Sequence, residues 1–136
     1  MTDIDVAIVS IPLKALPQIK PLIDALPADV VVIDTSNYFP GRDGHIDALD
    51  KGQVEGEWVS EQLGRPVVKA WNAIGWDSFA SKGLPAGHPE RIAIPVSGDS
   101  QQHRNIAIAL VNDTGFDGYD AGVLAESWRL QPGAPV

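Results

Sequence analysis

Small and polar residues follow four apolar runs of this chain, and their types suit the binding of a ligand. The four segments are Ser10-Ile11-Pro12, Asp34-Thr35-Ser36-Asn37, Ala70-Trp71-Asn72 and Ser97-Gly98-Asp99. If the apolar runs are parallel strands, these segments meet at one edge of the sheet, where open α/β sheets bind their ligands. Any one segment is also typical of an ordinary turn. Four together predict a ligand cleft.

Motifs that grip phosphate or activate a nucleophile are absent from the sequence. No two glycines are separated by a single residue, which excludes G-x-G-x-x-G. The P-loop pattern G-x-x-x-x-G-K-[ST] and the nucleophile elbow G-x-S-x-G are absent as well. The chain therefore has no sequence signature of a backbone cradle for phosphate, and a hydrolase is disfavoured.

Metal and thiol chemistry are also disfavoured. Asp43, His45 and Asp47 alternate, but a glycine-rich turn lies just before them and the other two histidines are far along the chain. Because a metal site needs three or four convergent ligands, we expect none here. The chain has no cysteine, which excludes disulfides, iron–sulfur clusters and thiol catalysis.

The elements that must position the polar segments are strand-like runs alternating with helix-like stretches. The expected strands are Val6–Ile11, Val30–Ile33, Pro66–Ala70 and Arg91–Val96, with Phe116–Ala121 as a weaker fifth. The clearer runs are apolar on both faces, as expected of strands covered on both sides. This pattern predicts an α/β fold with a mainly parallel sheet and flanking helices.

Three helical stretches lie between the strands. Pro17 and Pro21 prevent one regular helix over Leu13–Leu26, so a turn followed by a short helix is expected there. Ile46–Leu63 is expected in two pieces, broken around Gly52 and Gly56. The third helix is expected to begin after Asp99 or Ser100 and to end at Gly115.

Length and charge limit the class of protein. The 136 residues suffice for a single domain over 1–136. Eighteen acidic against ten basic residues give a net charge of -8, which repels phosphate backbones and argues against nucleic-acid binding. Residues 1–20 contain acids and no long apolar run. We therefore expect a cytoplasmic protein with no membrane partner.

Several segments together resemble the coenzyme F-420-dependent NADP oxidoreductase family. They are 32–40 (VIDTSNYFP), 60–64 (SEQLG), 67–72 (VVKAWN), 120–122 (DAG), 124–129 (LAESWR) and 131–133 (QPG). The resemblance runs along nearly the whole chain. It implies an NADP-dependent oxidoreductase that transfers hydride between NADP(H) and a small molecule carrying a second ring, a deazaflavin such as coenzyme F-420 or a flavin.

The resemblance also implies which residues bind the cofactor, and it implies no catalytic side chain, because hydride transfer needs two closely placed rings rather than a nucleophile. Ile11 and Pro12 would lie along the nicotinamide. Residues of the third segment would line the ring pocket, with Asn37 as a further candidate; they are Ala70, Asn72, Ala73 and Ile74. The amide of Asn72 would hydrogen-bond a carboxamide or, alternatively, stabilise a turn. Glu126, Ser127 and Trp128 would face the second ring or a dimer partner.

By the same resemblance the chain is the C-terminal part of a Rossmann-type NAD(P)-binding sheet, a single partial domain that begins at the family's fourth strand. In the doubly wound order this strand pairs with the first, which is absent here, so Val6–Ile11 is expected to have an open edge. An open edge predicts a homo-oligomer. The alternative is a non-catalytic binding or interaction module that uses the cleft or the edge.

Overall fold

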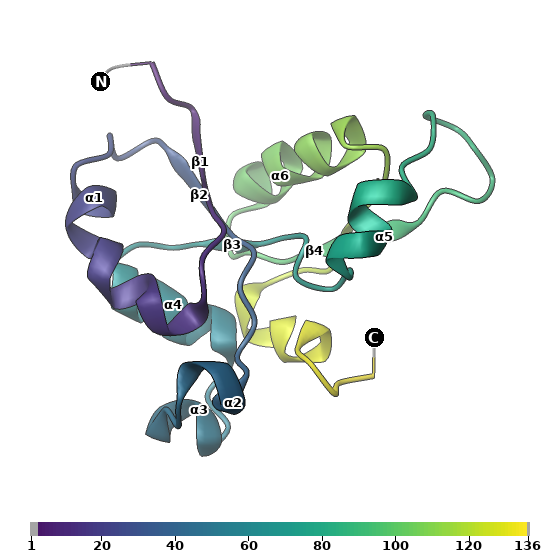
Figure 1. Cartoon of the computed structure of the whole chain (residues 1–136). Helices are drawn as coiled ribbons and strands as arrows, with labels where there is room; N and C mark the ends of the chain where they lie inside the picture. Colours follow the sequence, from purple (N-terminus) through teal and green to yellow (C-terminus); the bar gives the residue numbers. More distant parts are fainter. Residues whose placement is uncertain (1–2, 136) are drawn as a thin grey trace.

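The structure, a computed structural model, describes residues 3–135. Its strands alternate with helical segments along the chain (Figure 1). The strands are β1 (Val6–Val9), β2 (Val31–Asp34), β3 (Val68–Lys69), β4 (Ala93–Val96) and β5 (Asp117–Asp120). The α-helices are α1 (Lys20–Asp24), α2 (Pro40–Asp43), α3 (Asp47–Asp50), α4 (Glu55–Leu63), α5 (Trp76–Ser81) and α6 (Gln101–Asp113). Two 3₁₀ helices complete the set, η1 (Leu13–Ile19) and η2 (Leu124–Leu130).

All strand ladders in the described residues are parallel. β1, β2 and β3 form one sheet in that order, and β4 pairs with β5 in a second. The two sheets meet where Lys69 and Ser97 exchange backbone hydrogen bonds of 2.7 and 3.0 Å. The predicted α/β fold with a mainly parallel sheet is confirmed.

β2 is buried on both faces because its side chains alternate between two cores. Val32 belongs to a core beneath η1, α1 and α4, which lie together on one side of the sheet (Figure 1). Val31 and Ile33 belong to a second core beneath α6 on the other side. All three side chains are at most 2% exposed. The uninterrupted apolar run of this strand follows from that double covering.

The helix predictions are largely confirmed. Pro17 lies inside η1, and α1 follows directly, which is the predicted turn and short helix. The Ser100 hydroxyl accepts a 3.2 Å hydrogen bond from the His103 amide and caps α6, and Gly115 follows its end with φ +96°. The short helices α2 and α5 and the segment η2 were not predicted, because each is only one or two turns long.

The predicted break at Gly56 is wrong. Gly56 lies in the first turn of α4, and the break falls earlier, at Lys51–Val54 around Gly52. A Cβ at position 56 would come within 2.7 Å of the Leu124 side chain. Glycine is required here because η2 packs closely against α4.

Candidate functional site

A cleft of about 640 Å³ lies at the carboxyl ends of β1, β2 and β3. Six of the seven predicted cofactor-binding residues line it: Ile11, Pro12, Asn37, Asn72, Ala73 and Ile74. The other lining residues are Ser10, Thr35, Ser36, Phe39, Arg42, Gly75 and Trp76. Three separate strand ends thus contribute to one hollow, as expected for the carboxyl edge of a parallel sheet.

Ala70 does not line the cleft, so its expected place in the ring pocket is wrong. It is fully buried in the core beneath α6. The next residue, Trp71, has φ +59°, the left-handed region that a bulky side chain rarely adopts. This turn leaves Ala70 in the core while the chain continues into the cleft wall at Asn72 and Ala73.

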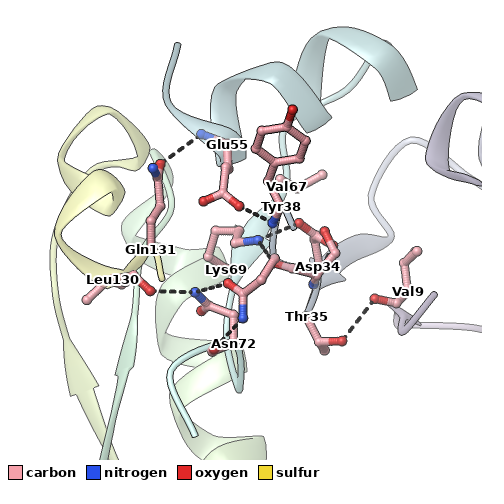
Figure 2. Close-up of polar contacts among 12 residues, drawn as sticks. Val9, Asp34, Thr35, Tyr38, Glu55, Val67, Lys69, Asn72, Leu130 and Gln131 are labelled. Carbon is pink, nitrogen blue, oxygen red and sulfur yellow. Dashed lines mark hydrogen bonds and ion pairs between the residues drawn. The ribbon is translucent and has the colours of Figure 1, made fainter. Parts of the chain in front are cut away.

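The side chain of Asn72 connects the cleft wall to the C-terminal segment (Figure 2). Asn37 Nδ2 donates to the backbone oxygen of Asn72 at 2.7 Å. Asn72 Nδ2 donates to the backbone oxygen of Leu130 at 3.1 Å and lies 3.4 Å from Asn37 Oδ1. The amide nitrogen of Asn72 therefore fastens the cleft wall to the C-terminal segment, a long-range contact rather than the turn stabilisation considered from the sequence.

Two polar atoms at the cleft have no hydrogen-bond partner within residues 3–135. They are Ser36 Oγ and Asn72 Oδ1. Ser36 is 5% and Asn72 7% exposed, and both residues line the cleft. Each of these two oxygens is itself covered by protein atoms, so a ligand in the cleft would reach it only after a local side-chain movement.

A buried ion pair supports the loop after β2. Lys69 Nζ donates to Asp34 Oδ2 at 2.8 Å and also to the backbone oxygen of Ser36 (Figure 2). The other carboxylate oxygen, Asp34 Oδ1, accepts a 3.0 Å hydrogen bond from the Ser36 amide. The side chains of Lys69 and Asp34 are at most 3% exposed. The pair thus fixes the position of Ser36 at the cleft.

Sequence reasoning passed over this pair, although a signal was present. A lysine inside an apolar strand is costly unless an opposite charge neutralises it, and Asp34 ends the neighbouring strand. The register pairs Asp34 directly with Lys69. Opposite charges at the ends of two adjacent apolar strands therefore indicate a buried ion pair.

Glu55 extends the buried polar network toward the C-terminal segment. Its carboxylate accepts a hydrogen bond from the Tyr38 amide, and its own amide donates to Gln131 Oε1 at 2.9 Å (Figure 2). Burial raises the pKa of Glu55, and the Tyr38 amide and the Lys69 ammonium partly oppose that rise. Glu55 was not predicted as a functional residue.

An apolar groove of about 360 Å³ adjoins the cleft. It shares Ser10, Thr35, Ile74 and Trp76 with the cleft and adds Ile8, Trp71, Phe79 and Thr114. Trp71, expected at the cleft, lies here, and its ring contacts Phe79 edge-on with centroids 6.5 Å apart. The groove is thus aromatic and lies beside the outer strand β1.

Of the residues expected near a second ring or a partner, Ser127 faces neither. It is 3% exposed and lies against Gly56 of α4. Trp128 is 41% exposed, and the guanidinium of Arg129 stacks 4.6 Å from its ring centre.

The alternating residues considered as metal ligands pair with other charged side chains. Asp43 bonds Arg42, His45 bonds Asp50 and Asp47 bonds Lys51. No group of three or more potential ligands gathers in the described part of the chain. No helix within residues 3–135 is both long and apolar enough to cross a membrane.

Comparison with solved structures identifies the fold as Rossmann-like. The hypothetical protein SMa0349 of Sinorhizobium meliloti superposes with a TM-score of 0.80 and 27% identity over 96% of this chain. A protein of Arthrobacter sp. FB24, assigned as an F420-dependent NADP-reductase, superposes with a TM-score of 0.67 and 18% identity over 93% of this chain. UDP-D-ManNAc dehydrogenase of Pyrococcus horikoshii superposes with a TM-score of 0.53 and 14% identity over 90% of this chain. The chain therefore shares the Rossmann-like fold of these proteins.

Sequence comparison adds one relative and no family. The Escherichia coli (strain K12) protein YjhV is 48% identical over 52 residues, which is 38% of each chain. No protein-family model matches the sequence. The chain spans less than two thirds of the proteins that it matches in structure, namely 63%, 60% and 29% of their lengths.

Proposed function

We propose that the cleft binds the nicotinamide end of NADP(H), and that the chain belongs to an oxidoreductase that transfers hydride to or from a deazaflavin or flavin. The Rossmann-like fold and the resemblance to coenzyme F-420-dependent NADP oxidoreductases support the cofactor class. The position of the cleft at the carboxyl ends of parallel strands supports its role as the binding site.

The observation that carries the proposal is the cleft at the carboxyl ends of three parallel strands, which six of the seven expected cofactor-binding residues line. Two oxygens beside it, Asn72 Oδ1 and Ser36 Oγ, add to the proposal if a local movement exposes them. A nicotinamide carboxamide has an NH₂ group that donates and a carbonyl oxygen that accepts. Asn72 Oδ1 would accept from the NH₂ group, and the Ser36 hydroxyl would donate to the carbonyl oxygen. The hydrogen bond to Leu130 holds the side-chain amide of Asn72, and the buried ion pair holds the backbone of Ser36.

The chemistry asks for positioning rather than for a reactive side chain. The nicotinamide, when bound, supplies or accepts the hydride at its ring. The two rings must stack at about 3–3.5 Å with water excluded. Ala73 has a small side chain on the cleft wall and leaves room for this approach, while Ile11 and Pro12 supply an apolar surface for the ring.

The phosphate end of the cofactor fits the chain less well. Arg42 is the charged residue lining the cleft, and its guanidinium already pairs with Asp43 at 2.9 Å. The sequence also has no glycine-rich phosphate loop. We expect NADPH to bind the isolated chain with a dissociation constant of about 1 mM, worth roughly 4 kcal/mol, without appreciable turnover.

A titration followed by backbone NMR tests the proposal. Adding NADPH to the ¹⁵N-labelled chain should shift the amide signals of Ser36, Asn72 and Ala73 with saturation in the millimolar range. Ala73→Leu should weaken those shifts by obstructing the ring, whereas Ala93→Leu, at an exposed position of β4 away from the cleft, should not. Shifts elsewhere only, or no shifts at 10 mM (roughly ten times the expected constant), would contradict the proposed site. Micromolar affinity would contradict the expected weak binding of the phosphates.

The alternative, a non-catalytic interaction module, is favoured by one observation, the open edge of the sheet at β1. The two functions differ in their dependence on the cleft. A module that acts through its edge would keep its interactions in the Ala73→Leu variant, whereas binding of the nicotinamide would be lost.

A further inference from the structure

Phe39 and Arg42 form a separate wall of the cleft, on the loop and the short helix α2 that follow β2. The proposed nicotinamide position lies against the other walls, which come from the ends of β1 and β3. Phe39 is 44% exposed, and the guanidinium carbon of Arg42 lies 5.2 Å from the centre of its ring. The whole cleft, about 640 Å³, has the size of sites that bind complete small-molecule ligands. It therefore has room for more than a nicotinamide ring.

The guanidinium of Arg42 is held in one orientation by hydrogen bonds from two of its nitrogens. Nε and Nη2 donate to the two carboxylate oxygens of Asp43 at 3.1 and 2.9 Å, and Nη2 also donates to the Asn37 backbone oxygen at 2.7 Å. The third nitrogen, Nη1, makes no hydrogen bond within residues 3–135, and the Arg42 side chain is 43% exposed. The N–H groups of Nη1 are thus available to a ligand.

Asn37 connects this wall to the wall expected to hold the nicotinamide. Its backbone oxygen accepts from Arg42, and its side-chain Nδ2 donates to the Asn72 backbone oxygen at 2.7 Å. A single residue thereby fixes the position of Arg42 relative to Asn72 and Ala73. Two flat groups bound to the two walls would be held in a fixed relation, which hydride transfer between rings requires.

The charge around Arg42 favours a neutral acceptor over a phosphate. Asp43 already occupies the edge of the guanidinium that binds anions through two parallel hydrogen bonds. Burial alone would raise the pKa of Asp43, but hydrogen bonds from Arg42 and from the Phe39 and Lys14 amides bring the pKa below its ordinary 3.8. The carboxylate is therefore ionised at neutral pH and balances the charge of Arg42. A carbonyl oxygen, by contrast, needs a donor and no net positive charge.

We propose that Phe39 and Arg42 form the subsite for the second ring, which packs against Phe39 and accepts a hydrogen bond from Arg42 Nη1 at a carbonyl oxygen of its pyrimidinedione edge. This inference rests on the proposed function, because it takes the redox partner of the nicotinamide to be a deazaflavin or a flavin. Both of those rings carry the pyrimidinedione edge, with its two carbonyl groups. The subsite thus recognises the ring itself rather than a phosphate attached to it.

Two flavins that differ in charge test the subsite in the chain of 136 residues. FMN has the ring and a phosphate, whereas riboflavin has the ring alone. The protein is added to a dilute solution of either flavin, and quenching of the flavin fluorescence reports binding. The two dissociation constants should agree within about twofold, and inorganic phosphate should displace neither flavin. Absence of binding, binding of FMN alone, or displacement by phosphate would overturn the proposal.

Side-chain variants locate the bound flavin. Arg42→Met should raise the dissociation constant of riboflavin about tenfold, because a hydrogen bond from a charged group is lost. Arg129→Met is the matched control, since Arg129 also pairs with an acidic side chain, Glu126, and stacks on an exposed ring, Trp128, but lies outside the cleft. It should leave the constant unchanged. Equal weakening in both variants, or unchanged affinity in a folded Arg42→Met variant, would overturn the proposal.

Phe39→Leu decides the matter if Arg42→Met does not fold, because it leaves the ion pair between Arg42 and Asp43 intact. The loss of ring packing should weaken riboflavin binding about threefold. Unchanged affinity in this variant would also overturn the proposal.

NADPH separates a failure of this subsite from a failure of the proposed function. In the Arg42→Met variant, NADPH should still shift the amide signals of Asn72 and Ala73. Retained NADPH shifts without any binding of riboflavin to the unmodified chain would overturn the subsite alone. Riboflavin binding that depends on Arg42, without NADPH shifts, would support the subsite and contradict the nicotinamide site.

Discussion

The two outer strands of this protein, β1 and β5, differ in how they meet solvent. β5 has the sequence Asp-Gly-Tyr-Asp, and both of its carboxylates form ion pairs, Asp117 with Arg91 at 3.0 Å and Asp120 with Arg104 at 2.8 Å. β1 has the sequence Val-Ala-Ile-Val and no charge. Proteins protect an open edge with charged residues, and β5 shows that protection while β1 does not.

The difference indicates that the two edges have different purposes. β5 is an edge strand whose charged side chains suit contact with water. β1 has the composition of an interior strand, similar to that of β2, yet it pairs on one side only. The fold itself depends on the centre of the sheet, where β2 is covered on both faces.

The largest expected effect is a loss of stability when the buried ion pair at the centre of the sheet is broken. Lys69→Met would leave Asp34 as an uncompensated buried charge, so the free energy of unfolding should fall by about 3–5 kcal/mol. Urea unfolding at several protein concentrations measures it. Lys51→Met, which removes an exposed ion pair with Asp47, is the control and should change stability by about 0.5 kcal/mol or less. Similar losses in both variants would contradict the assigned role of the buried pair.

A smaller effect is expected at the protected edge. Arg104 Nε donates to Asp120, and its two terminal nitrogens donate to the Gly98 backbone oxygen and to Gln101. Arg104→Met should lower the free energy of unfolding by about 2 kcal/mol, because hydrogen bonds to a charged group are lost. Thermal and urea unfolding measure this loss. An unchanged stability would show that the β5 edge does not need its charges.

The smallest expected effect is a dependence of the free energy of unfolding on pH, which differs in sign between Asp120 of β5 and Glu55. Hydrogen bonds from Gln101, the Gly122 amide and Arg104 lower the pKa of Asp120 below its ordinary 3.8. Its carboxylate therefore stabilises the fold above that pH, and the contribution disappears as the pH falls through the lowered pKa. The advantage of the unmodified chain over Asp120→Asn should accordingly be lost in acid.

The contribution of Glu55 to stability should change with pH in the opposite direction. Its pKa is raised above 4.5 by burial, so its ionisation costs stability as the pH rises through the raised value. The unmodified chain should lose stability relative to Glu55→Gln over that range. Unfolding curves at a series of pH values measure both variants, and slopes of the same sign would contradict the two assignments.

Much of the fold could be predicted because the strands are apolar on both faces. That pattern placed four strands and the parallel sheet, whereas the polar fifth strand was a weaker prediction. The strand ends shifted: the first ends at Val9 rather than Ile11, and the third shortens to Val68–Lys69. Strand ends are poorly marked in sequence because polar residues such as Ser10 follow a strand whether or not it is still hydrogen-bonded.

The site was harder to predict because several of its features depend on contacts between distant residues. The strand ends indicated the cleft, but Ala70 lies in the core beneath α6, on the same side as Val68 two positions earlier. The left-handed backbone of Trp71 has no local signal in the sequence. The hydrogen bond from Asn72 to Leu130 crosses 58 positions of the chain. Such contacts follow from the packing of η2 against α4, which became clear only in three dimensions.

The attachment of η2 to the cleft has a consequence for how the protein is made. The cleft wall at Asn72 relies on Leu130, and the amide of Glu55 relies on Gln131, 76 positions later. A ribosome synthesises the chain from its amino end, so β1, β2 and β3 emerge well before either late residue. The sheet can therefore begin to assemble first, whereas the cleft reaches its final shape only after Leu130 and Gln131 have left the exit tunnel.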